Sequence, residues 1–94
     1  VEIELNEAYE LSSVSPNPIR SQATMELAVQ QAQPVTATVY DLLGRRVETV
    51  YSGDVAANSP IELRLSADGL SSGTYFVRFE GDTFTATRRL TVVR

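Results

Sequence analysis

Residues 70–82 read LSSGTYFVRFEGD, and this stretch indicates the fold more clearly than any other part of the chain. Apolar side chains occupy every second position from Tyr75 to Phe79, which is the period of a half-buried β-strand. Gly73 permits a tight backbone entry into this strand, and we expect Leu70 to plug the end of a sandwich. In Greek-key sandwiches, a Tyr at the start of the sixth strand packs inwards and hydrogen-bonds to the preceding corner. We therefore expect a tyrosine corner at Tyr75, with a ligand-binding role for its side chain as the alternative.

The same period of two extends outward from this strand and is interrupted by turn residues at short intervals. No segment of useful length has a helical period. The pattern predicts strands over residues 1–5, 9–14, 23–30, 35–40, 47–51, 61–66, 75–80 and 83–93. We therefore predict an all-β fold, an immunoglobulin-like β-sandwich of about seven antiparallel strands with Greek-key connections.

One hairpin is indicated by Asp41-Leu42-Leu43-Gly44, which has the composition of a type I turn. Asp41 caps the first position and Gly44 takes the left-handed one, so the strands on either side pair with each other. Exposed apolar side chains at a hairpin tip are unusual. We therefore expect Leu42 and Leu43 to fold over the open end of the core, and the alternative is a docking surface.

Two irregularities are expected in the strands. The turn-forming residues Ser52-Gly53-Asp54 are expected to end the second strand of the hairpin. In the last strand, Arg88 interrupts a run of inward-facing apolar positions, which predicts a β-bulge at Arg88-Arg89.

The composition excludes several classes of function. With 94 residues, of which 43% are hydrophobic and 21% charged, the chain is long enough for one packed domain and too short for two. His, Cys, Lys and Trp are absent, which removes the usual general base, thiolate chemistry, disulfides and the commonest metal ligands. A net charge of −4 argues against nucleic acid as a partner. No apolar run approaches the ~18 residues needed to span a bilayer.

The carboxylates do not form a catalytic or metal-binding pattern either. Asp41, Asp54, Asp68 and Asp82 fall in four separate predicted turns, where each has a local turn-forming role. Catalysis by two carboxylates needs both in one cleft, and calcium loops need densely spaced acidic residues. We therefore expect no catalytic residue, no metal site and no cofactor, and we expect this domain not to be an enzyme.

Four blocks of the sequence, taken in order, resemble a known family. They are Ser15-Pro16-Asn17-Pro18, residues 39–47, residues 70–78 and Arg88-Arg89-Leu90. In this order and spacing they are similar to the type A C-terminal sorting domain of the type IX (Por) secretion system, which ends many secreted proteins of Bacteroidota. The resemblance covers residues 11–94, and residues 1–10 are interpreted as a linker or an extra N-terminal strand.

The resemblance implies a seven-stranded sandwich that acts as an export signal and not as a catalyst. In this family, a secreted protein first reaches the periplasm, where outer-membrane translocon and shuttle proteins recognise its C-terminal domain. A sortase-like C-terminal signal peptidase often removes the domain and joins the cargo to a surface lipopolysaccharide. The resemblance therefore implies a larger secreted protein, such as a hydrolase, that ends at the cell surface or outside the cell.

The last strand is the main candidate for recognition by that machinery. The candidate residues are Arg88, Arg89, Leu90, Val92 and Arg94, together with Leu42 and Leu43 at the hairpin tip. At a sheet edge, this strand would offer free backbone groups to a partner while its Arg side chains set the orientation. The alternative is an ordinary closing strand with a solvated basic rim. The family usually has a Lys in this block, and Arg keeps the charge but changes the geometry of the donors.

Two other functions compete with the sorting role. One is an immunoglobulin-like module that binds carbohydrate or protein and is appended to a secreted hydrolase. Sugar-binding faces present coplanar aromatic rings. Most aromatic residues of this chain occupy strand positions that are expected to face the core, and the exceptions are Tyr40, Tyr51 and Phe76. The other is a spacer that separates the cargo from the membrane. The oligomeric state is not predicted.

Overall fold

The computed structural model describes residues 7–94 of the chain, and every regular element among them is a β-strand. In chain order the strands are β1 (Tyr9–Leu11), β2 (Gln22–Val29), β3 (Gln33–Asp41), β4 (Arg46–Val55), β5 (Ile61–Ser66), β6 (Gly73–Gly81) and β7 (Thr85–Val92). The predicted strand over residues 1–5 lies outside the described residues. Within residues 7–94, no helix is long and apolar enough to cross a membrane.

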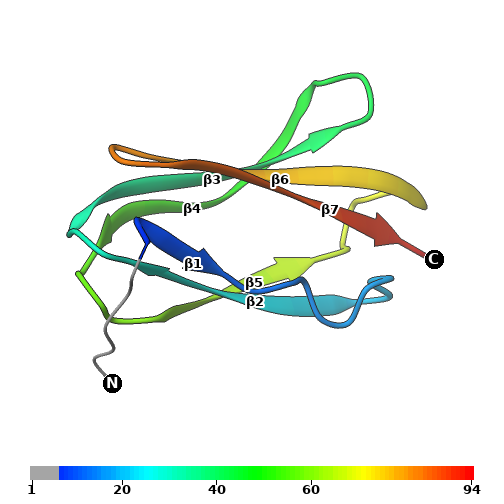
Figure 1. The fold of residues 1–94 in the computed structure, drawn as a ribbon. Coiled ribbons are helices and arrows are strands. Elements are labelled where there is room, and N and C mark those ends of the chain that lie inside the picture. Colours follow the sequence, from blue (N-terminus) through cyan, green and yellow to red (C-terminus); the bar gives the residue numbers. More distant parts are fainter. Residues whose placement is uncertain (1–6) are drawn as a thin grey trace.

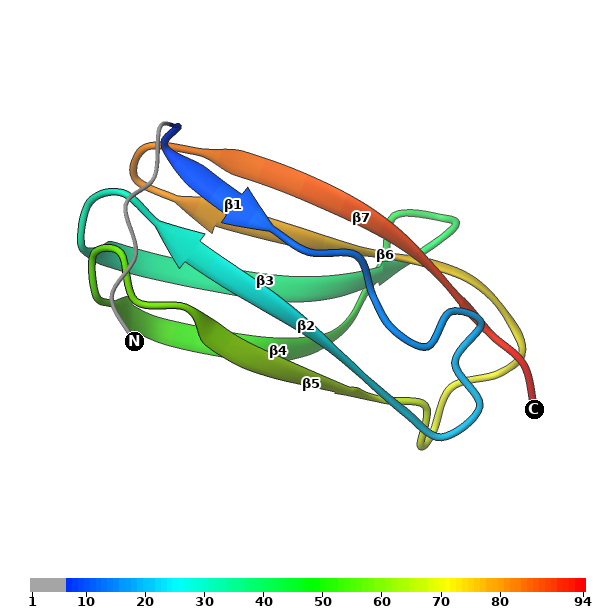
Figure 2. The ribbon, with the colours of Figure 1, turned by 60° about the horizontal axis from the view of Figure 1, so that its bottom comes forward.

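The strands form two antiparallel sheets that pack face to face (Figure 1). One sheet has the order β1-β2-β5, and the other has the order β4-β3-β6-β7. The chain crosses from one sheet to the other after β2, after β4 and after β5, as Figure 2 also shows. These are the layers and crossovers of an immunoglobulin-like Greek-key sandwich, so the predicted fold class is confirmed.

The core lies between the sheets and is built largely from alternate residues of the strands. Strand β4 is the exception, because Val55 is its only buried residue. In β6, Val77 and Phe79 are completely buried, so the predicted period of two is the observed period of burial. The hydroxyl of Tyr75 donates a hydrogen bond to the Ser71 carbonyl at 2.8 Å, and Leu70 packs against the core. The expected tyrosine corner is therefore present at the entry to β6.

A buried amide holds the turn between β6 and β7 at the opposite end. The Gln33 side chain accepts a hydrogen bond from the Thr83 N–H at 3.0 Å and donates to the Thr83 hydroxyl and the Gln31 carbonyl, both at 2.9 Å. The ring of Phe84 stacks on Tyr9, with centroids 4.7 Å apart. These contacts connect β1, β3 and the β6–β7 turn.

Strand β4 is longer than predicted. It continues through Ser52-Gly53-Asp54 to Val55, because the first residues of β3 extend far enough to pair with this part of it. The prediction of a strand break was wrong, and Asp54 lies in a strand and not in a turn. A local turn signal is overridden when a partner strand supplies a continuous ladder.

The bulge expected in the last strand was also a wrong prediction. Strand β7 pairs with β6 in continuous register through Arg88 and Arg89. Arg88 keeps its inward parity because its long side chain reaches the rim of the sandwich, where it donates to the Leu11 carbonyl at 3.2 Å. The register shifts lie instead in the β3–β4 pair, before Thr38 and before Tyr40.

Candidate functional site

The candidate residues of the last strand divide between the core and the surface. Strand β7 is an edge strand of its sheet, as recognition by strand addition requires. Leu90 and Val92 are each only 1% exposed, so their side chains belong to the core. Arg89 is exposed and lies opposite Phe76 of β6. A partner that meets the folded domain can therefore contact Arg89 but not the two apolar side chains.

The other two arginines of this block connect β7 to distant segments. The Arg88 guanidinium donates to the Leu11 carbonyl on β1, across the open side of the sandwich. Arg94 donates from its backbone N–H to the Ser72 hydroxyl at 2.9 Å and from its guanidinium to the Ala67 carbonyl. The guanidinium group suits this role because it carries several fixed donors.

The Pro-Asn-Pro segment covers the C-terminal half of the β7 edge, which Figure 2 shows beside the end of the chain. The Ile19 N–H donates to the Thr91 carbonyl at 2.7 Å, and the Val93 N–H donates to the Ile19 carbonyl at 2.9 Å. The Asn17 side chain accepts from the Thr91 N–H at 3.0 Å and donates to the Arg89 carbonyl at 3.5 Å. Its amide thus occupies the position of a neighbouring strand's peptide group, and the flanking prolines cannot extend the pairing.

The N-terminal half of the β7 edge has no such cover. Alternate residues of an edge strand direct their N–H and C=O groups outward, and Thr91 is one of these because its groups bond the Pro-Asn-Pro segment. Thr85 and Thr87 share its parity, and β7 pairs only with β6. The Thr87 carbonyl accepts a hydrogen bond from the Arg88 guanidinium at 3.2 Å. The open part of the edge is therefore Thr85 and the N–H of Thr87, with Arg89 beyond them.

Hydrogen bonds to Asp41 hold the hairpin tip between β3 and β4. One carboxylate oxygen accepts the backbone N–H groups of Leu43 at 2.9 Å and Arg45 at 3.0 Å, and the other accepts the Arg45 side chain at 2.9 Å. The Arg45 backbone N–H is the main cause of a lowered pKa for the Asp41 carboxyl. Gly44 takes a left-handed φ of 82°, as the turn requires. The predicted turn is confirmed.

The side chains at this tip do not cover the core. Leu42 is 67% exposed and Leu43 is 77% exposed, so the expectation that they fold over the open end of the sandwich was wrong. The hairpin bends away from the sheet and projects beyond the sandwich at the upper right of Figure 1. The register shifts in the β3–β4 pair account for this bend, because bulges increase the local twist of a strand.

A groove of about 370 Å³ lies between this tip and the outer face of the four-stranded sheet. It is lined by Tyr40, Leu42, Phe76, Arg78 and Thr87, among others. Tyr40 and Phe76 are direct cross-strand neighbours there, so their rings are within reach of each other.

Tyr51, the third aromatic residue that was expected to face away from the core, has a structural role. Tyr51 packs against the core, and its hydroxyl donates to the Asp54 carbonyl at 2.9 Å. Tyr40 and Phe76 are therefore the two aromatic residues of this group that lie side by side on the outer face.

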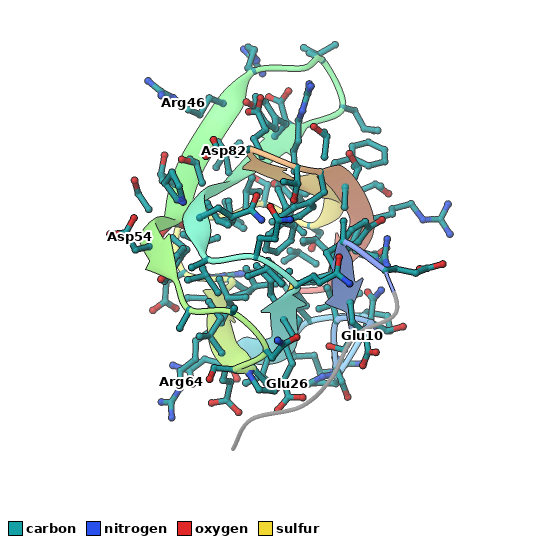
Figure 3. All side chains as sticks on the ribbon, turned by 60° about the vertical axis from the view of Figure 1, so that its left-hand side comes forward. Glu10, Glu26, Arg46, Asp54, Arg64 and Asp82 are labelled. Atoms are coloured by element: carbon teal, nitrogen blue, oxygen red, sulfur yellow. The ribbon has the colours of Figure 1, made fainter. Side chains whose placement is uncertain are left out.

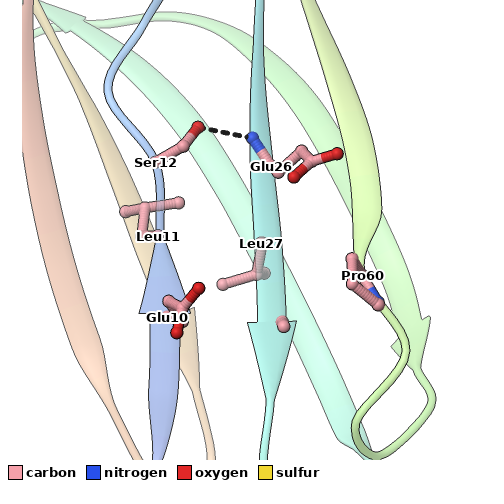
Figure 4. A pocket seen from close by; sticks show the side chains of 7 residues that line it. Glu10, Leu11, Ser12, Glu26, Leu27 and Pro60 are labelled. Carbon is pink, nitrogen blue, oxygen red and sulfur yellow. Dashed lines mark hydrogen bonds between the residues drawn. The ribbon is translucent and has the colours of Figure 1, made fainter. Parts of the chain in front are cut away.

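A second groove, on the outer face of the three-stranded sheet, contains two carboxylates. Glu10 and Glu26 line it together with Ser12, whose hydroxyl accepts the Glu26 backbone N–H at 2.8 Å (Figure 4). Both carboxylates are exposed to water, and in Figure 4 they extend from neighbouring strands without converging on one point. Within residues 7–94, no group of three acidic, His or Cys side chains is placed to hold a metal ion.

Comparison with known proteins agrees with this architecture. A family model described as "Secretion system C-terminal sorting domain" matches residues 13–93. The crystal structure of dimeric latent PorU from Porphyromonas gingivalis contains a similar fold, with a TM-score of 0.69 and 19% sequence identity. The match covers 93% of this chain and only 10% of that one. Among curated proteins, no similar sequence was found.

Proposed function

Because this chain belongs to the type IX secretion system C-terminal sorting domains, we propose that it directs a larger secreted protein through the outer membrane and to the cell surface. The single observation that carries this proposal is the family match, which covers residues 13–93 and so nearly the whole sandwich. The family is a non-catalytic one, and its sorting role implies contact with the secretion machinery.

The order of events that we propose follows the family. The parent protein passes through the periplasm, outer-membrane translocon and shuttle proteins bind this domain, and a sortase-like C-terminal signal peptidase removes it at the surface. We further propose residues 11–94 as the sorting domain and residues 1–10 as a linker or an extra strand. The pairing of Tyr9 and Glu10 with β2 supports a strand at the end of that segment.

We propose that the machinery recognises the folded sandwich at its exposed features. These are the open edge of β7 at Thr85 and the Thr87 N–H, the Arg89 side chain, and the hairpin tip with Leu42 and Leu43. The other residues of the terminal block act through the fold, since they are buried or bonded to other segments.

The test is export of a reporter. The whole chain is fused to the C-terminus of a periplasmic reporter protein, because β1 begins at Tyr9. In a host with a type IX system, the fusion is expected at the cell surface, and the reporter alone is expected in the periplasm. Retention of the fusion in the periplasm, with the domain folded, would contradict the proposal.

A further inference from the structure

We propose that the groove beneath the β3–β4 hairpin is a docking site for a protein segment that carries aliphatic side chains and carboxylates. We call it the docking groove and define it by Tyr40, Leu42, Phe76 and Arg78. Leu43 is the next residue of the same hairpin tip and lines a neighbouring hollow that shares Asp41 and Leu42 with the groove. This inference deepens the sorting role and rests on it, since it specifies what a component of the export machinery would present to this domain.

The apolar wall of the docking groove is exposed, and hydrogen bonds hold the turn that carries it. Leu42 and Leu43 are the most exposed large apolar residues among residues 7–94. They are held outward by a turn in which Asp41 accepts bonds from two backbone N–H groups and from the Arg45 side chain. A backbone that is already held by hydrogen bonds loses less conformational entropy on binding, so more of the free energy from burying these side chains would appear as affinity.

The floor of the docking groove is aromatic. Tyr40 and Phe76 lie side by side on the outer face, and both are partly exposed. The Tyr40 hydroxyl makes no hydrogen bond to any of the described residues, so it is free to meet a partner. Aromatic residues are enriched at protein interfaces, and Tyr is enriched among the residues that stabilise them most.

The rim of the docking groove is positively charged. The strand register places Arg46 beside Tyr40, Arg89 beside Phe76, and Arg78 in the lining. Among residues 7–94, no carboxylate forms an ion pair with any of these three arginines. Figure 3 shows Arg46 extending away from the body of the domain.

The neighbouring acidic groups offset this charge only in part. Asp41 is paired with Arg45, and Glu48 and Glu80 lie on the same sheet but outside the lining of the groove, which contains Arg78. A cluster of free arginines on a chain of net charge −4 selects for a partner that carries carboxylates.

A protein segment fits this surface better than a polysaccharide does. Sugars bind by stacking on aromatic planes and by hydrogen bonds to polar side chains, and leucines offer neither. Leu42 and Leu43 would remain unused by a sugar, whereas aliphatic side chains of a protein segment can bury them. The carbohydrate alternative is therefore one of the outcomes that the experiment distinguishes.

The binding test uses the isotope-labelled whole chain and two short synthetic peptides. In one peptide Leu alternates with Glu, and in the other Lys replaces Glu. We expect the Glu peptide to shift the amide resonances of residues 40–46, 76–78 and 87–89, and the Lys peptide to leave them unchanged. Binding should become about tenfold weaker in the variant Leu42→Ser/Leu43→Ser, whose thermal unfolding should match that of the wild type.

Charge reversal tests the proposed chemistry of the partner. The variant Arg78→Glu/Arg89→Glu should no longer bind the Glu peptide and should bind the Lys peptide instead. Arg64→Glu is the matched control, because Arg64 lies on the opposite sheet (Figure 3) and should change neither affinity. Binding of neither peptide would overturn the proposal, and so would shifts at the same amides with polygalacturonate alone.

Export of the reporter separates this inference from the sorting role itself. If the wild-type fusion reaches the surface and Leu42→Ser/Leu43→Ser does so equally well, the docking groove is not the recognition site and the sorting role stands. If the wild-type fusion is not exported, the sorting role fails, while the peptide titration still decides whether the groove binds an acidic segment. We expect export of the wild type and a clear loss in the double variant.

Discussion

Replacement of Asn17 by Ala should weaken the attachment of the Pro-Asn-Pro segment to the edge of β7 and so lower the stability of the domain. The Asn17 side chain bonds the backbone of β7 on both sides of Leu90, with its oxygen on the Thr91 N–H and its nitrogen on the Arg89 carbonyl. Ala removes both bonds and leaves the prolines and the two backbone bonds of Ile19 in place. The substitution therefore isolates what the amide itself contributes.

The expected loss follows from the geometry of these two bonds. The bond to Thr91 is 3.0 Å long and should contribute about 0.5–1.5 kcal/mol to the free energy of unfolding. The bond to Arg89 is 3.5 Å long, at the limit of a hydrogen bond, and should contribute little. A total of about 1 kcal/mol lowers the Tm of a domain of this size by roughly 4–8 °C.

The assay combines thermal unfolding with amide exchange at Thr91. In Asn17→Ala, the Thr91 amide should exchange about fivefold faster, which corresponds to about 1 kcal/mol. Asn17→Asp is the matched control, because it keeps the oxygen that accepts the Thr91 N–H and loses only the longer contact. It should retain most of the stability. An unchanged Tm together with an unchanged Thr91 exchange rate in Asn17→Ala would refute the reasoning.

Three further predictions concern the corner, the far turn and the hairpin tip. Tyr75→Phe removes the bond of the tyrosine corner and should lower the free energy of unfolding by about 1 kcal/mol in chemical denaturation, whereas Tyr40→Phe should leave it unchanged. Gly81→Ala places a Cβ 2.5 Å from the Gln33 side-chain oxygen and 2.6 Å from the Phe84 ring and should lower the Tm by an amount corresponding to about 1–3 kcal/mol, while an equal Tm would show that both side chains move aside freely. The lowered pKa of Asp41 means that its contacts stabilise the hairpin above the ordinary carboxyl pKa of about 4 and are lost as the pH falls through the lowered value. An NMR titration of its carboxyl carbon should therefore show a midpoint below the ordinary one, and a midpoint at or above it would contradict the turn geometry.

Features encoded by neighbouring residues could be predicted from the sequence. The alternation from Tyr75 to Phe79 predicts the strand and its buried face, and the tyrosine corner follows from a Tyr two residues after Gly73. The Asp41–Gly44 turn is likewise local, since every bond that holds it lies within five residues. In each case the conformational preference of the residues and the final structure agree.

Features that depend on distant segments could not be predicted in this way. The cover of β7 by Asn17 joins residues 74 positions apart, and Arg88 meets Leu11 across 77 positions. The continuation of β4 depends on how far β3 extends beside it. The exposure of Leu42 and Leu43 follows from the bend of the hairpin, which hydrophobicity alone does not indicate.

Two designed variants would report on the stability of the fold and not on recognition. Deletion of residues 90–94 would remove Leu90 and Val92 from the core, so a loss of export in that truncation would report unfolding and not recognition. A Cβ at Gly73 would meet no atom within 4 Å, so Gly73→Ala would destabilise the domain through its φ of 155° and not through a clash.

The most direct measurement of the central claim is the surface exposure of a reporter fused to the whole chain, in two hosts that differ only in the type IX system. Added protease should cleave the reporter on intact cells of the host with the system and should spare it in the host without the system. Equal protection in both hosts, with the sandwich folded, would contradict the assignment of this chain as an export signal.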